Sequence, residues 1–236
     1  MIAIGASPIL TRLYSPEAYG VFALMLAFVT FALALVSFHY EMAIALPAKD
    51  QDAASLTILA LGIATAVSVI SVFLFAPWGL NLLGRFGYSS LLPYWPLLPI
   101  TILAAAFHQA LQLWHLRHER YRQVASNAVV LSLTLNVGPI ILGFLGFTHL
   151  GLLLGLVAAR CVSAVGLLIR AIRLDLALLS EALKTISKVA TEYRTFPAVG
   201  LPGAVLHIAC FQLPAFLLAS FYGAGVTGFY LLQDRV

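Results

Sequence analysis

Long apolar stretches separated by short polar tracts dominate the hydropathy pattern of this sequence. A helix needs about 20 apolar residues to cross the hydrocarbon core of a bilayer. The stretches that reach or approach this length are Ala18–Phe38, Ala53–Leu83, Leu91–Leu116, Val124–Phe147, Gly151–Ile169 and Phe196–Phe221. The pattern therefore predicts an all-α fold, a polytopic transmembrane helix bundle with six full spans.

Two of these stretches have irregular ends. The first stays apolar past Glu41 as far as Leu46, and the second is interrupted around Pro77-Trp78-Gly79. Both ends of the chain carry shorter apolar segments. We interpret Met1–Leu10, which lacks the basic leader of a signal peptide, as the second half of a span, and Gly228–Val236 as the opening of another. The sequence is thus expected to be an N-terminal fragment with partial spans at both ends.

Three regions are expected along the chain. Residues 1–169 would form an N-terminal transmembrane bundle of a half span and five full spans, and residues 196–236 would begin a second bundle. Between them, residues 170–195 mix leucines with Asp175, Glu181 and lysines at roughly helical spacing. This spacing indicates an amphipathic helix on the cytoplasmic face. It serves either as a linker between the bundles or as a simple connecting helix.

Basic residues are divided unequally between the two sets of loops. The loops after Leu46, Leu116 and Ile169 hold nine, which are Lys49, Arg117, Arg120, Arg122, Arg170, Arg173, Lys184, Lys188 and Arg194. The opposite set holds Arg12 and Arg85. Because cytoplasmic loops are enriched in Lys and Arg, we expect the first set to be cytoplasmic.

Composition excludes a water-soluble domain. Hydrophobic residues make up 62% of the chain and charged residues 9%, whereas soluble domains carry about 25% charged residues. The net charge of +4 is spread over short tracts between spans. That placement excludes nucleic acid as a partner and makes the lipid bilayer the expected one. Cys161 and Cys210 lie in apolar stretches and are interpreted as packing residues.

Two charged residues lie where charge is expensive. Arg160 is near the centre of its span, where insertion costs about 2.5–3.5 kcal/mol. It either lines a hydrated pathway and attracts an anionic substrate such as a pyrophosphate, or forms a structural ion pair or carbonyl contact. Glu41 is either a proton or cation site or an acid paired across the bundle. His39, two residues away, is expected on a different helix face.

Uncharged polar residues form a stripe in the Leu91–Leu116 span. His108, Gln112 and His115 recur at spacings of four and three, which places them on one face. They indicate either the wall of a lumen or interhelical hydrogen bonding. No metal site is predicted, because no acid or cysteine accompanies the histidines in this segment.

Elsewhere, polar residues lie close to prolines. Asn136 precedes Gly138-Pro139, and His207 lies between Pro202 and Pro214. Either residue alone is typical of packing, but with the prolines they indicate kinked helices around a cavity. The predicted substrate pathway therefore comprises Arg160, Glu41, His108, Gln112, Asn136 and His207.

The sequence contains one helix-packing motif and lacks the common catalytic signatures. The spacing Gly151-x-x-x-Gly155 predicts that another helix approaches closely. Zinc-protease, nucleophile-elbow and phosphate-loop signatures and paired carboxylates are missing from the sequence. We therefore expect a protein that is not an enzyme, with no catalytic residue and no cofactor.

Several segments resemble one family. Pro8–Gly20 (PILTRLYSPEAYG) resembles the first-loop motif of polysaccharide biosynthesis flippases of the O-antigen translocase type, in the multidrug/oligosaccharidyl-lipid/polysaccharide exporter superfamily. Looser similarity lies in Tyr40–Pro47, Trp114–Tyr121, Tyr193–Pro197 and Phe221–Tyr230. The resemblance implies two pseudo-symmetric halves around a cationic cavity, which favours the pathway interpretation of Arg160.

The resemblance also implies a function and a place in the cell. Lipid-linked sugar units would be moved from the cytoplasmic to the outer leaflet of the bacterial inner membrane, coupled to a cation or proton gradient. Two alternatives stay open. One is a multidrug or peptidoglycan-precursor exporter of the same superfamily. The other is part of a membrane glycan polymerase or ligase, although such enzymes would be expected to carry a large outer loop.

Overall fold

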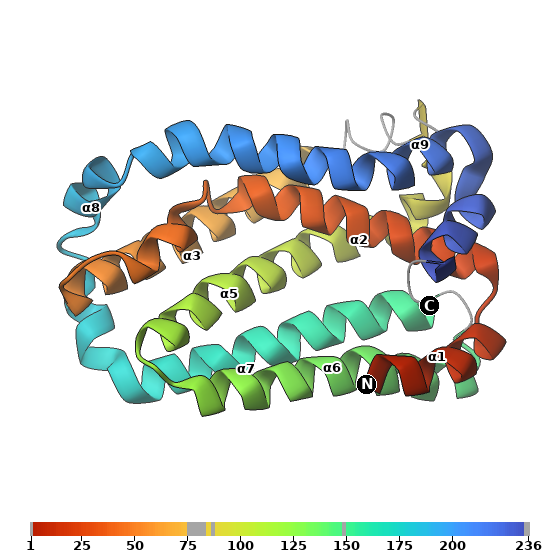
Figure 1. Ribbon diagram of the computed structural model, residues 1–236, viewed down its shortest axis with the longest axis horizontal. Coiled ribbons are helices and arrows are strands. Elements are labelled where there is room, and N and C mark those ends of the chain that lie inside the picture. The colour runs from red at the N-terminus through yellow and green to blue at the C-terminus, as the bar shows by residue number, and fades with distance from the viewer. Residues whose placement is uncertain (1, 75–83, 86–87, 148–149, 234–236) are drawn as a thin grey trace.

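The structure, a computed structural model, describes residues 2–74, 84–85, 88–147 and 150–233 (Figure 1). The described residues contain helices and no strand. The long helices are α1 (Ile2–Leu13), α2 (Pro16–Val36), α3 (Asp50–Leu74), α5 (Leu97–Arg117), α6 (Tyr121–Phe144), α7 (Leu150–Ala182) and α9 (Leu201–Gln233). Among the described residues, six helices are long and apolar enough to cross a membrane. The predicted fold class is therefore confirmed.

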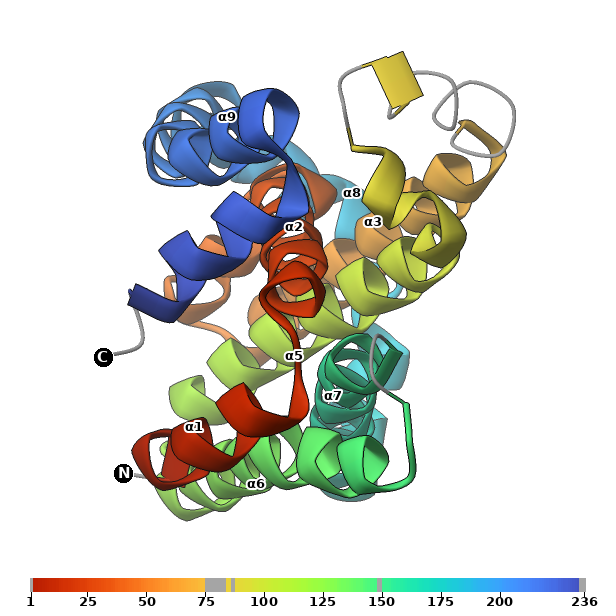
Figure 2. The ribbon, with the colours of Figure 1, turned by 90° about the vertical axis from the view of Figure 1, so that its right-hand side faces the viewer.

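Short helical elements join the long ones. They are η1 (Tyr40–Ala45), η3 (Ser89–Tyr94), α8 (Ile186–Glu192) and η4 (Phe196–Gly200). Figure 1 shows α8 and the turn between α5 and α6 at one end of the bundle, with α1 at the opposite end. In the view of Figure 2, α2 lies between α9 and the α5–α7 pair, with α1 and α6 on the far side of that pair.

The start of α2 follows from its sequence. Ser15 precedes the helix, and its Oγ accepts a hydrogen bond of 3.3 Å from the backbone N–H of Ala18. Pro16 occupies the first position and Glu17 lies in the first turn. Ser15 is favoured before the helix because its hydroxyl satisfies an unpaired backbone N–H. Pro16 is favoured at the first position because it has no N–H to satisfy, and the negative charge of Glu17 complements the helix dipole.

The end of α2 differs from the prediction. The apolar run to Leu46 is not one helix, because α2 ends at Val36 and Phe38 and His39 have positive φ angles of 49° and 64°. The chain continues as the 3₁₀ helix η1. The helix α3 replaces the stretch Ala53–Leu83, and the predicted break at Pro77-Trp78-Gly79 lies outside the described residues.

The last two long helices each extend past their predicted ends and contain a break. The helix α7 continues beyond Ile169 to Ala182, with non-helical angles at Asp175. The helix α9 passes Phe221 and changes direction at Gly223, where φ is 80° and ψ is 179°. The residues predicted to open a new span at Gly228 are the second part of α9, as far as Gln233. The linker role of residues 170–195 stays a prediction.

Burial separates central from peripheral helices. More than half of the apolar stretch of α2 and of α5 is buried, against less than a fifth in α6 and in the segment that contains α9. The apolar residues of α6 and α9 therefore form much of the surface. A surface of this kind is suited to lipid, since six helices of spanning length carry it.

The predicted close approach at Gly151 and Gly155 is observed. A Cβ added at Gly155 would overlap the ring of Pro139 in α6, and one added at Gly151 would overlap the side chain of Tyr14. The Tyr14 hydroxyl donates a hydrogen bond of 2.7 Å to the carbonyl oxygen of Pro139. The small residues thus let α7 and the α1–α2 turn pack directly against Pro139 of α6.

A second close approach joins α2 to the last part of α9. A Cβ added at Gly20 would overlap the backbone of Ala224, and one added at Gly228 would overlap the backbone of Pro16. Neither backbone can move aside as a flexible side chain can. Glycine is therefore required on both helices at this crossing.

We predict that Gly228→Ala lowers the stability of the protein in detergent by about 1–3 kcal/mol, the usual cost of overpacking. The matched control is Gly203→Ala in the same helix, because a Cβ there meets nothing within 4 Å. Thermal unfolding midpoints of the purified variants would measure the difference. Equal midpoints for both variants would contradict the crossing.

Candidate functional site

A buried polar cluster joins α5, α6 and α7. Ser163 Oγ lies 2.7 Å from Nδ1 of His108, and Asn127 Nδ2 donates to Ser163 Oγ at 2.6 Å. Asn127 Nδ2 also lies 3.4 Å from His108 Nδ1, and Gln112 follows His108 by one turn of α5. Each of the three helices contributes a side chain. The predicted stripe of His108 and Gln112 therefore faces the interior, where interhelical hydrogen bonding occupies His108.

Arg160 lies one helical turn before Ser163 on α7 and is half-buried. Its charge is close enough to act on the imidazole of His108. Among the described residues, no hydrogen bond or ion pair involves its guanidinium group. The ion pair that the sequence left open as an alternative is therefore not formed by the described part of the chain.

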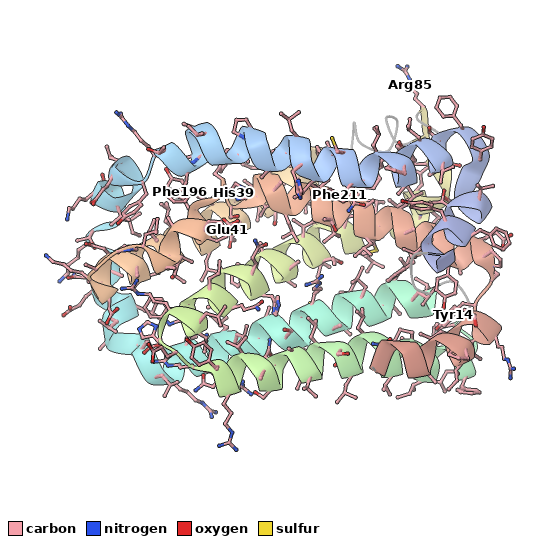
Figure 3. All side chains as sticks on the ribbon, viewed as in Figure 1. Tyr14, His39, Glu41, Arg85, Phe196 and Phe211 are labelled. Atoms are coloured by element: carbon pink, nitrogen blue, oxygen red, sulfur yellow. The ribbon has the colours of Figure 1, made fainter. Side chains whose placement is uncertain are left out.

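Glu41 belongs to a second polar group, in which α5 meets η1. Its Oε1 lies 3.2 Å from Nδ1 of His39 and accepts a bond of 3.5 Å from Nε2 of Gln109. The expectation that His39 points to a different face is wrong. The positive φ angles at Phe38 and His39 break the helix and fold the imidazole back onto the carboxylate. Figure 3 shows His39 and Glu41 beside Phe196 of η4.

The remaining predicted pathway residues lie apart from both groups. Asn136 is buried, and its Nδ2 donates to the Ser132 carbonyl oxygen of its own helix at 2.7 Å. His207 is exposed on α9 and packs on the ring of Phe211, with centroids 4.8 Å apart. His115 is buried and bonds through Nδ1 to the Leu111 carbonyl oxygen at 2.8 Å. A single pathway lined by all six predicted residues stays a prediction.

The sequence did not reveal a third cluster, centred on Asp175 at the break in α7. Arg120 binds this carboxylate with both terminal nitrogens, at 2.6 and 2.7 Å. Trp114 Nε1 donates to Asp175 Oδ2 at 2.9 Å, and the ring of His118 packs on the indole at 4.2 Å. The hydrogen bonds that Arg120 donates to Asp175 raise the pKa of Arg120 above its ordinary value. The cluster ties the turn between α5 and α6 to α7.

Two features of the sequence point to this cluster, which are the position of Asp175 between two leucines and the family resemblance of the segment that holds its partners. Asp175 lies between Leu174 and Leu176, in the stretch whose spacing predicts an amphipathic helix. It is 6% exposed, whereas those two leucines are exposed. Its two hydrogen-bonding partners, Trp114 and Arg120, belong to the Trp114–Tyr121 segment, one of the segments that carry the family resemblance. That segment therefore has a structural role in holding the end of α7.

One cavity of about 290 Å³ lies between α2, α3 and α5. Its walls are almost entirely apolar, with Phe28 and Phe31 on one side and Ser68 and Ser71 on another. Arg160, His108 and Glu41 are not among its lining residues. This cavity has room for an acyl chain or another apolar group, and none of its lining residues in the described part of the chain is charged.

A comparison with protein families matches residues 9–236 to the family described as polysaccharide biosynthesis protein. The chain belongs to this family. The match confirms the resemblance seen in the Pro8–Gly20 motif and covers all three polar clusters. As a polysaccharide biosynthesis protein, it acts in that process as a multi-pass membrane protein. Comparisons with curated proteins and with solved structures found no match.

We predict that Asp175→Ala destabilises the protein by about 3 kcal/mol or more, because it leaves the Arg120 guanidinium without its partner. The matched control is Asp50→Ala. The Asp50 side chain is 55% exposed in its pair with Arg117, so its loss should cost at most about 1 kcal/mol. Denaturant unfolding of both variants in detergent micelles would measure the two losses. Similar losses would show that the Asp175 cluster does not hold α7.

Proposed function

We propose that this protein translocates a lipid-linked oligosaccharide precursor from the cytoplasmic to the outer leaflet of the bacterial inner membrane. The observation that carries the proposal is the guanidinium group of Arg160, half-buried in the spanning helix α7 without a partner among the described residues. An arginine in such a place is costly unless it serves an anion or a hydrated path.

Arginine fits the anionic part of such a substrate. A lipid-linked sugar carries a phosphate or pyrophosphate between the lipid and the glycan, and guanidinium binds phosphate through two parallel hydrogen bonds. The neighbouring His108 lies against Ser163 and Asn127, so its imidazole is held in place. No described carboxylate forms an ion pair with Arg160 and competes for the substrate.

The orientation is proposed from the basic loops. Arg117, Arg120 and Arg122 follow α5, and Lys184 and Lys188 lie around α8. Figure 1 places α8 and the α5–α6 turn at the same end of the bundle. Arg85 and Tyr14 lie toward the opposite end in Figure 3. This separation supports a cytoplasmic position for the first end, because basic residues are retained there.

Substitution of Arg160 tests the proposal in a strain that lacks the gene and carries a plasmid copy. We expect Arg160→Ala to reduce surface polysaccharide by about tenfold or more, since a lost charged hydrogen bond costs about 1.5–3 kcal/mol. Arg160→Lys should retain part of the activity, because it keeps the charge and loses the paired geometry. The matched control is Arg173→Ala, an exposed arginine of the same helix.

Membrane levels of each variant would be measured alongside the polysaccharide. Lipid-linked units that accumulate in the cytoplasmic leaflet support translocation, whereas unpolymerised units in the outer leaflet favour the polymerase or ligase alternative. Undiminished polysaccharide with Arg160→Ala at normal membrane levels would refute the role of Arg160.

A further inference from the structure

Ser68 differs from the other hydroxyl side chains of α3. Each of the others donates a hydrogen bond to a carbonyl oxygen of α3 itself, and these are Ser55, Thr57, Thr65 and Ser71. Ser68 is 4% exposed, and its Oγ is buried without a hydrogen-bond partner in the described chain. A buried hydroxyl group without a partner is costly, so this one is available to a molecule from outside the chain.

Two cavities meet at Ser68. The cavity of about 290 Å³ between α2, α3 and α5 and a second cavity of about 320 Å³ are both lined by Ser68 and Pro99. Trp95 and Pro96 also line the second cavity, and none of the described residues that line either cavity is charged. Each cavity has the size of a small ligand site, and together they form a connected apolar space.

The second cavity is continuous with the apolar surface of the bundle. Val69, Val72 and Ile100 line it, and all three side chains are exposed. Figure 2 shows α3 beside the first part of α5 at the edge of the bundle, away from α1 and α6. A lipid of the surrounding bilayer can therefore enter this space from the side, without passing between the central helices.

The position of Ser68 along α3 places it near the edge of the hydrocarbon core. Asp50 begins the helix and is paired with Arg117 at an exposed position. The rise of an α-helix places Ser68 about 27 Å beyond Asp50, and the hydrocarbon core is about 30 Å thick. Ser68 therefore lies near the opposite boundary, where Trp95 is also favoured because tryptophan is enriched at the interface.

The walls of the two cavities define the chemistry of the ligand. Apolar walls accept a hydrocarbon chain, and the Ser68 hydroxyl group can donate to one acceptor at the end of that chain. The acyl chain of a phospholipid provides both, because an ester carbonyl joins it to glycerol. A lipid whose chain is joined directly to a phosphate does not fit as well, since its charge would meet no cation among the described lining residues.

We propose that these cavities bind one phospholipid from the leaflet on the side of η3, with an acyl chain between α2, α3 and α5. The ester carbonyl of that chain accepts a hydrogen bond from Ser68 Oγ. The chain fills space that the helices leave open, and so it stabilises the packing of α3 against α5. This site is separate from Arg160 and does not depend on the proposed function.

Photolabelling of the purified full chain in lipid nanodiscs tests the site. The probe is phosphatidylcholine with a diazirine in one acyl chain, at low mole fraction, and mass spectrometry identifies the labelled residues. We expect labels to concentrate on the cavity residues of α3 and α5, and not on Val137 and Ile141, which are exposed on α6. An ether-linked analogue, which has no ester carbonyl, should label the cavity about two- to tenfold less, because one hydrogen bond is lost.

A variant of Ser68 tests the hydrogen bond directly. Ser68→Ala should reduce labelling by the ester probe to the level of the ether analogue and leave labelling by that analogue unchanged. The matched control is Thr65→Ala on the same helix, because Thr65 is exposed and its hydroxyl group already donates to the Leu61 carbonyl oxygen. This control should label as the wild type does.

Three results would overturn the proposal. They are equal labelling by the ester and ether probes, labels spread evenly over α3 and α6, and displacement of the probe by a long-chain alkyl phosphate. The last result would assign the space to a lipid phosphate instead. Because phosphatidylcholine is not the proposed substrate, Arg160→Ala should label as the wild type does, and the outcome is independent of whether Arg160 binds a phosphate.

Discussion

Polar groups inside a bundle that faces lipid have no water to bond to, so a partner on the same helix or on a neighbouring one stabilises them. The arrangement of this protein depends on that requirement. Ser163, Asn127 and His108 join α7, α6 and α5, Tyr14 joins the α1–α2 turn to α6, and Ser55 joins α3 to α7 through the Ala182 carbonyl oxygen. Apolar packing brings the helices together, whereas these few bonds determine which faces meet.

The number and type of the spans could be predicted from the sequence, because apolar length alone decides whether a helix can cross. The ends of the helices could not. The apolar run through Phe38 to Leu46 gives no sign of the left-handed residues that end α2. Conversely, Arg170 does not end α7, because its guanidinium reaches out to the Gln123 carbonyl oxygen and Ser126 Oγ while its backbone stays helical.

The polar clusters were predictable only in part, for the same reason. Spacing along one helix placed His108 and Gln112 on an inward face, and this was sufficient because both belong to α5. The hydrogen bonds that involve Ser163, Asn127 and Asp175 join residues 36 to 61 positions apart in the sequence. Periodicity describes one helix at a time, so it cannot identify such partners. His39 and Glu41 are close in sequence, yet their contact depends on backbone angles that periodicity assumes to be helical.

The crossing of α2 with the end of α9 has a reciprocal geometry. Gly228 faces Pro16, and Gly20 faces Ala224, so a step of four residues forward along one helix matches a step of four backward along the other. This is the pattern of a two-fold axis, as in a symmetric dimer, but within one chain. Farther along the same pair of helices, the ring of Phe216 of α9 packs edge-on against Phe28 and Phe31 of α2. The glycine crossing at one end and the aromatic contact farther along therefore fix the register of α9 on α2 at two separate points.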